Sequence, residues 1–277
     1  MNKREITLGH SPDPDDAFMF YALAASKIDT GELSFRHVIE DIETLNRRAM
    51  NAELDVTAIS IHAYSYVLDQ YALLTSGASM GDSYGPLVIS REPMGMNQLR
   101  NAIIAVPGKM TTAYLALRLC LGDPKSIVIP FDKIMDAVEE RKADAGLLIH
   151  EGQLTYASRG FEKVIDLGEW WKLETGLPLP LGGNAIKKSL GPELIAEVSR
   201  LLRESIEYGL AHRDEAVRHS MTYARGMATD LTDKFVGMYV NDFTLDYGDE
   251  GRAAVRELLD RGHDAGVIPR PVELEFA

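Results

Sequence analysis

One pattern occurs twice in the chain, and this repetition constrains the fold more than any other feature. Residues 46–66 read NRRAMNAELDVTAISIHAYSY, and residues 136–156 read DAVEERKADAGLLIHEGQLTY. Each copy runs from a charged helical stretch through an Asp into an apolar strand that ends in Ile-His, with a Tyr further on. In open α/β sheets, ligands bind at the carboxyl ends of the strands. The repeat therefore predicts two similar α/β lobes that direct polar groups at one shared crevice.

Short apolar runs alternate with helical patterns along most of the chain. This alternation predicts parallel sheets with crossover helices, and runs such as AIIAV and GLLI indicate strands covered on both faces. From Pro192 onward the pattern becomes entirely helical, with helices expected from 192, near 212–224, 230–242 and 248–265. Strands are expected at 4–9, 33–38, 55–61, 71–76, 85–91, 102–106, 126–130, 144–149, 162–166 and 180–187, and helices at 15–27, 41–51, 111–121, 132–142 and 167–174.

Two segments, 85–93 and 177–188, have the pattern of connections between lobes. The expected division is a large α/β lobe of residues 1–92 plus 186–277, which carries the helical tail, and a small α/β lobe of residues 93–185. Small-molecule sites often lie between domains, and closure of two lobes can expel water from such a site. We therefore expect the ligand in the cleft between the lobes.

Composition excludes several classes of function. A net charge of −13 argues against nucleic acid as a partner, because phosphate binding needs clustered Lys and Arg. The single cysteine, Cys120, lies in an apolar run and is expected to be a buried thiol. The sequence shows no apolar segment of a secretory signal and no run of about 18 apolar residues that would span a membrane. A cytoplasmic protein is expected, and a homodimer is possible.

Two strand-to-helix turns carry candidate binding residues. In SPDPDDAFMF, Ser11 and Asp15 either contact ligand hydroxyls or belong to a helix-capping turn. In PGKMTTAYL, the turn at Thr111, Thr112 and Ala113 presents free backbone N–H groups that suit a carboxylate, although Thr111 could be only an N-cap.

His150, which follows the second copy of the strand, is the strongest candidate for a general base. A hydrogen-bonded structural role is its alternative. His62 in the first copy is a weaker candidate, and His10, which also ends a strand, is left open. No spacing of metal ligands occurs, so no metal is expected.

With these residues in view, the chain resembles the 1,4-dihydroxy-6-naphthoate synthase family of the futalosine route to menaquinone. The matching pieces are LGHSPDPDDAFMFYAL, DVTAISIHAYSYV, GKMTTAYLALRL, GLLIHEGQLTY and PLPLGGNAIKK. The resemblance implies a two-lobe fold like type 2 periplasmic binding proteins, and cofactor-free cleavage of cyclic dehypoxanthinylfutalosine. It places the base on His150 and carboxylate contacts on Ser60, Thr112 and Ala113. The full set of binding candidates is Ser11, Asp15, Ser60, Ile61, Thr111, Thr112 and Ala113.

The chain departs from the family in one loop. The family usually reads Ser-Pro-Cys-Pro-Asn-Asp-Thr-Phe where residues 11–18 read SPDPDDAF. Two additional carboxylates would disfavour an anionic ligand there unless another group compensates. Two alternatives therefore stay open, a related enzyme of the chorismate dehydratase type and a non-catalytic solute-binding protein for a small carboxylate.

Overall fold

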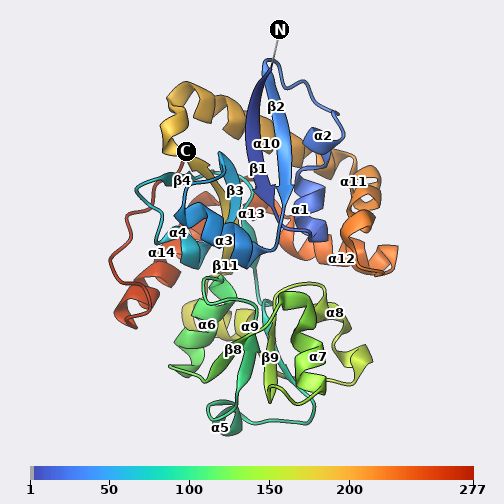
Figure 1. The fold of residues 1–277 in the computed structure, drawn as a ribbon, viewed down its shortest axis with the longest axis vertical. Coiled ribbons are helices and arrows are strands. Elements are labelled where there is room, and N and C mark those ends of the chain that lie inside the picture. Colours follow the sequence, from blue (N-terminus) through green and yellow to red (C-terminus); the bar gives the residue numbers. More distant parts are fainter. Residues whose placement is uncertain (1–2) are drawn as a thin grey trace.

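The computed structural model describes residues 3–277, which form two α/β lobes, one above the other in Figure 1. Each lobe is built on its own sheet. The first sheet has the order β2-β1-β3-β11-β4, with β5 also paired to β11, and the second has the order β10-β6-β9-β7-β8. The strands are β1 (Arg4–His10), β2 (Leu33–Ile39), β3 (Val56–Ser60), β4 (Tyr71–Leu73), β5 (Ser79–Gly81), β6 (Leu87–Ser90), β7 (Ile104–Val106), β8 (Ser126–Val128), β9 (Ala145–Leu148), β10 (Glu162–Asp166) and β11 (Leu179–Lys187).

Helices cover both sheets, and the expected helical tail packs against the first lobe, where α10 and α11 contact α2 and α1. None of the helices within residues 3–277 combines the length and the apolar character that a membrane span requires. The helices are α1 (Pro14–Met19), α2 (Tyr21–Ala24), α3 (Ile42–Met50), α4 (Ile61–Tyr64), α5 (Met96–Leu99), α6 (Thr112–Leu121), α7 (Ile134–Glu139), α8 (Gly152–Thr155), α9 (Leu167–Thr175), α10 (Pro192–Ala211), α11 (Arg213–Ser220), α12 (Thr229–Tyr239), α13 (Asp242–Leu245) and α14 (Gly248–Asp264), with short 3-10 turns η1 (Phe131–Lys133), η2 (Ala157–Arg159), η3 (Lys188–Leu190) and η4 (Met221–Tyr223).

Both sheets are mixed rather than purely parallel. The pairs β1–β2 and β1–β3 are parallel, as are β7–β8 and β7–β9. In contrast, β11 runs antiparallel to β3, β4 and β5, and β6 runs antiparallel to β9 and β10. The antiparallel direction follows from the connections, because β6 and β11 are the strands by which the chain enters one lobe from the other.

The strand pairing also indicates which residues belong to each lobe. Residues 87–90, expected in the large lobe, pair as β6 with two strands of the second sheet. Residues 179–185, expected in the small lobe, are part of β11 and pair within the first sheet. Sheet membership therefore favours limits near residues 82 and 178 in place of 92 and 185.

The repeat in the sequence corresponds to a repeat in the fold, with α3, β3 and α4 in one lobe and α7, β9 and α8 in the other. Its two aspartates have matching structural roles. Asp55 Oδ2 accepts hydrogen bonds from Thr7 N (2.9 Å) and Oγ1 (2.8 Å), and Asp144 Oδ2 accepts one from Ile103 N (2.8 Å). Each aspartate thus joins the start of its strand to the neighbouring chain segment, at the end of the strand away from the histidine.

Candidate functional site

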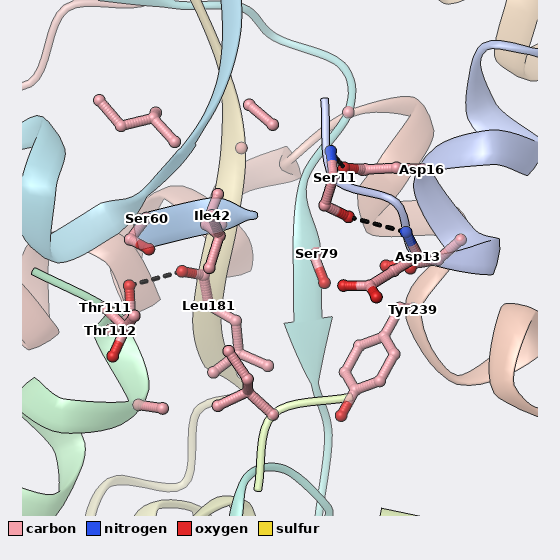
Figure 2. A pocket seen from close by; sticks show the side chains of 18 of the residues that line it. Ser11, Asp13, Asp16, Ile42, Ser60, Ser79, Thr111, Thr112, Leu181 and Tyr239 are labelled. Atoms are coloured by element: carbon pink, nitrogen blue, oxygen red, sulfur yellow. Dashed lines mark hydrogen bonds between the residues drawn. The ribbon is translucent and has the colours of Figure 1, made fainter. Parts of the chain in front are cut away.

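A cavity of about 110 Å³ lies where the two lobes meet. The first lobe contributes the loop between β1 and α1, the end of β3, residues of β11 and the end of α12. The second contributes the start of α6, together with Pro86 and Ile149. In Figure 2, Ser60 and Thr112 lie on one side of this space, and Ser11, Asp13 and Tyr239 lie on the other. The cavity therefore has two chemically different walls.

Ser60 is held on the first wall by a residue that was missed in the sequence. Asn46, fully buried on α3, accepts from Ser60 N through Oδ1 (2.9 Å) and donates from Nδ2 to Ser60 Oγ (3.0 Å). Because the Ser60 oxygen already accepts this bond, its own proton remains free to point at a ligand acceptor. The position of Asn46 at the start of the repeated segment was the available signal. Ile61 begins α4 but is fully buried and does not line the cavity.

The hydroxyls of Thr111 and Thr112 are engaged within the fold. Thr111 is the N-cap of α6, since its side chain accepts from Tyr114 N (3.2 Å) and donates to Gly108 O (2.9 Å). Thr112 Oγ1 donates to the Leu181 carbonyl and accepts from His62 N (3.2 Å). What α6 offers to a ligand is therefore the first-turn backbone N–H groups of Thr112 and Ala113, which have no partner inside the helix.

The second wall is acidic. Ser11 N donates to Asp16 Oδ2 (2.6 Å), and Asp13 is the N-cap of α1 without a side-chain capping bond. Asp15 lies inside the first turn of α1, where its Oδ1 is buried and has no hydrogen-bond partner among residues 3–277. Burial raises the pKa of Asp16 to about 6, although the bond from Ser11 opposes the shift. Burial, and then the neighbouring Asp16 and Asp13, raise the pKa of Asp15 well above its usual range. Asp15, one of the two carboxyls by which this loop departs from the family, therefore holds its proton to a higher pH than an ordinary aspartate.

Two further lining residues were not among the predicted set. Asn184 on β11 is 1% exposed, and its buried Nδ2 has no hydrogen-bond partner in the described part of the chain. Its amide lies over Gly77, where an added Cβ would come within 1.9 Å of Nδ2 and where φ is +88°. Tyr239 of α12 donates from its hydroxyl to Gln153 Oε1 (2.7 Å), which joins the tail to the second lobe. Asn184 and Asp15 together offer an unpaired donor and an unpaired acceptor to a ligand.

His150 lies beside the cavity but does not line it, whereas its neighbour Ile149 does. The ring is 4% exposed; Nε2 lies 2.9 Å from Phe131 O, and Nδ1 lies 3.1 Å from Gly152 N and 3.4 Å from Glu151 Oε2. Burial lowers the pKa of His150, but the hydrogen bond and charge of Glu151, and the charge of Asp13, outweigh it and raise the pKa above its usual value. Both ring nitrogens are occupied by protein groups.

The other two candidate histidines have structural surroundings. Burial lowers the pKa of His62 to about 4, and neither of its ring nitrogens reaches the cavity. His10 lies between Ser11 O (3.0 Å) and His37 Nδ1 (3.1 Å), and burial lowers its pKa to about 4 as well. Both imidazoles are therefore neutral near pH 7, and neither is among the residues that line the cavity.

The comparisons with known proteins cover nearly the whole chain. A family model described as menaquinone biosynthesis matches residues 6–264. The 1,4-dihydroxy-6-naphthoate synthase of Thermus thermophilus is 39% identical over 270 residues, which is 96% of this chain and 98% of that protein. The synthase of Streptomyces coelicolor is 38% identical over 275 residues, which is 97% and 96% of the two chains.

Solved structures resemble the chain as a whole. A crystal structure from Archaeoglobus fulgidus superposes with a TM-score of 0.92 at 47% identity and covers 95% of this chain and 98% of its own. The alkanesulfonate-binding protein of Xanthomonas axonopodis has a TM-score of 0.73 at 10% identity over the full length of both chains, which shows the fold alone. The expected two-lobe fold of type 2 periplasmic binding proteins is confirmed, with its helical tail. By the family model and by both synthases, the chain belongs to the menaquinone biosynthesis family.

Proposed function

We propose that the chain is a carbon–carbon lyase of menaquinone biosynthesis, which converts cyclic dehypoxanthinylfutalosine to 1,4-dihydroxy-6-naphthoate without a cofactor. The observation that carries this proposal is the 39% identity to a 1,4-dihydroxy-6-naphthoate synthase across 98% of that enzyme. The cavity between the lobes supports it, because its lining includes the predicted Ser60, Thr112 and Ala113.

The two walls of the cavity suit the two ends of such a substrate. The carboxylate would bind at Ser60 and the first-turn N–H groups of α6, where the helix dipole favours an anion. The hydroxyls would bind at Ser11 and Asp15 on the opposite side, and at Asn184 of β11. A protonated Asp15 can donate as well as accept, and it does not repel an anion. A neutral Asp15 would therefore remove one of the two additional charges of this loop.

His150 would be the general base of the reaction. To accept a proton from substrate, the ring must exchange its contact with the Phe131 carbonyl or with the Gly152 N–H for one with the ligand. A base acts in its neutral form, which for a histidine is present above its pKa. The pKa of His150 lies above the usual histidine value of about 6.5. We therefore expect kcat/KM to decrease as the pH is lowered through this raised pKa.

The test is turnover of cyclic dehypoxanthinylfutalosine, with 1,4-dihydroxy-6-naphthoate detected by mass spectrometry. The wild type should form product, and His150→Ala should lose turnover while binding substrate within about tenfold of wild type. His212→Ala is the matched control, because His212 is exposed on the tail and is not one of the residues that line the cavity. Full activity in His150→Ala would show that His150 is not the general base.

The same assay separates the alternatives. Turnover of chorismate in place of the proposed substrate would indicate an enzyme of the chorismate dehydratase type. Tight binding of either carboxylate without turnover would favour a solute-binding role, with which the likeness to the alkanesulfonate-binding protein is compatible at the level of the fold.

A further inference from the structure

Arg225 lies between η4 and α12 of the helical tail and contacts residues of both lobes. Its Nη1 donates to Glu151 Oε1 (2.9 Å) and Oε2 (2.8 Å) and to Asp13 Oδ1 (3.0 Å), and its Nη2 donates to Pro12 O (3.0 Å). Its guanidinium carbon lies 4.8 Å from the centre of the Phe131 ring. Asp13 and Pro12 belong to the first lobe, whereas Glu151 and Phe131 belong to the second. This one side chain therefore joins the two lobes.

The guanidinium of Arg225 offsets the charges of two carboxylates, one from each lobe, that would otherwise repel each other. The side chain of Glu151 is 10% exposed and that of Asp13 is 20% exposed, and both carboxylates accept hydrogen bonds from the same guanidinium nitrogen. Removing one partner from a buried ion pair leaves an uncompensated charge, which is strongly unfavourable. Arg225 is thus needed for Glu151 and Asp13 to lie together as they do.

Glu151 in turn faces the proposed base. Its Oε2, one of the two oxygens held by Arg225, lies 3.4 Å from His150 Nδ1. The charged groups around His150 are Glu151 from its own segment, Asp13 from the β1–α1 loop and Arg225 beyond them. Phe131 contributes its ring, 5.1 Å from that of His150, and its carbonyl oxygen, but no charge. Glu151 therefore contacts both Arg225 of the helical tail and the imidazole of His150.

We propose that Arg225 is a positioning residue, which holds Glu151 against His150 and so sets the protonation of the base when the lobes are together. The proposal rests on the role of His150 in the proposed function. Glu151 belongs to the matched IHEG segment, but Arg225 lies in the part of the tail where the sequence carries no motif. Only the folded chain brings the two together.

The direction in which the pKa of His150 shifts in Arg225 variants distinguishes a positioning role of Arg225 from the effect of its positive charge alone. If Arg225 were only a nearby positive charge, Arg225→Ala would raise the pKa of His150. If Arg225 holds Glu151 in place, its loss frees Glu151 to turn away, and the pKa of His150 falls, as it should in Glu151→Gln. Arg225→Lys keeps the charge but not the planar fork, so it should shift the pKa in the same direction by less.

The experiment is an NMR titration of isotopically labelled histidine side chains in the full-length protein, with the His150 signal assigned by its loss in His150→Gln. We expect the His150 pKa to fall by about one unit in Arg225→Ala, with no further fall in the double variant Arg225→Ala/Glu151→Gln relative to Glu151→Gln. Arg218→Ala is the control, because Arg218 is exposed on α11 and donates to Asp214 O (3.1 Å) within its own helix. A rise, no change, or additive shifts would overturn the proposal.

A kinetic readout connects the titration to the reaction. In Arg225→Ala, kcat should fall about tenfold with KM within about threefold, and the acid limb of kcat/KM should move to lower pH in parallel with the titration. A fall in stability alone would leave that limb in place and would contradict the positioning role. Should the wild type not turn over cyclic dehypoxanthinylfutalosine, the proposed function fails, while the titration still decides whether Arg225 controls His150.

Discussion

Single residues of the cavity wall carry polar atoms that have no hydrogen-bond partner within residues 3–277, and Asn184 is the clearest case. Its buried Nδ2 has no partner, which costs folding free energy unless a ligand accepts the bond. Asn184→Leu, of similar shape, should leave the free energy of unfolding unchanged or raise it by up to about 1 kcal/mol, while KM rises about tenfold. Urea unfolding and steady-state kinetics measure the two effects.

Asn51→Leu is the matched control, since Asn51 is an exposed residue at the end of α3 and outside the cavity lining. It should change neither KM nor kcat. A clear loss of stability in Asn184→Leu with KM unaltered would show that Asn184 is a packing residue rather than a ligand contact.

At the same scale, the sequence predicted residues better than it predicted their partners. Ser60, Thr112 and Ala113 were expected at the site, and all three line the cavity. Asn46, which supports Ser60, lies in the same repeated segment, whereas the Leu181 carbonyl that Thr112 contacts lies 69 positions away, and a pairing over such a separation leaves no local pattern. The same holds for Arg225, which is separated from Glu151 by 74 positions and from Asp13 by 212. Whether the predicted side chains contact substrate stays a prediction.

At the scale of elements, the start of α6 determines the proposed carboxylate site. Thr111 caps this helix, and replacing an N-cap threonine by alanine typically costs about 1 kcal/mol. We expect Thr111→Ala to lower the free energy of unfolding by about that amount and to raise KM, because a frayed first turn no longer holds the N–H groups in place. Thr111→Ser keeps the capping oxygen and should behave like the wild type in both measurements. If serine lost as much as alanine, the methyl group and not the cap would be responsible.

Elements themselves followed the local pattern closely, with exceptions that have physical causes. The helix expected at 15–27 is two short helices, α1 and α2, which are separated at Phe20, where the backbone angles (φ −98°, ψ 7°) depart from helical values. The strand pattern of 85–91 was read correctly, but apolar spacing does not say which sheet a strand joins. Nor does it give the direction in which the strand runs, and residues 87–90 pair antiparallel with two strands of the second sheet.

The whole molecule is acidic although its proposed substrate is an anion. With a net charge of −13, the mean field around the protein opposes approach of a carboxylate, and only the local donors of α6 and Ser60 attract it. Salt screens the long-range repulsion, since the Debye length shortens from about 30 Å at 0.01 M to about 8 Å at 0.15 M ionic strength, but it weakens the short-range contacts less. We therefore expect kcat/KM to rise about two- to threefold over this range with kcat unchanged, when steady-state rates are measured against added NaCl. The uncharged methyl ester of the same substrate is the control and should show no such rise. A fall of kcat/KM with salt would instead indicate that a positive local field at the cleft dominates the approach of the substrate, and the acidic surface would then have no part in its kinetics.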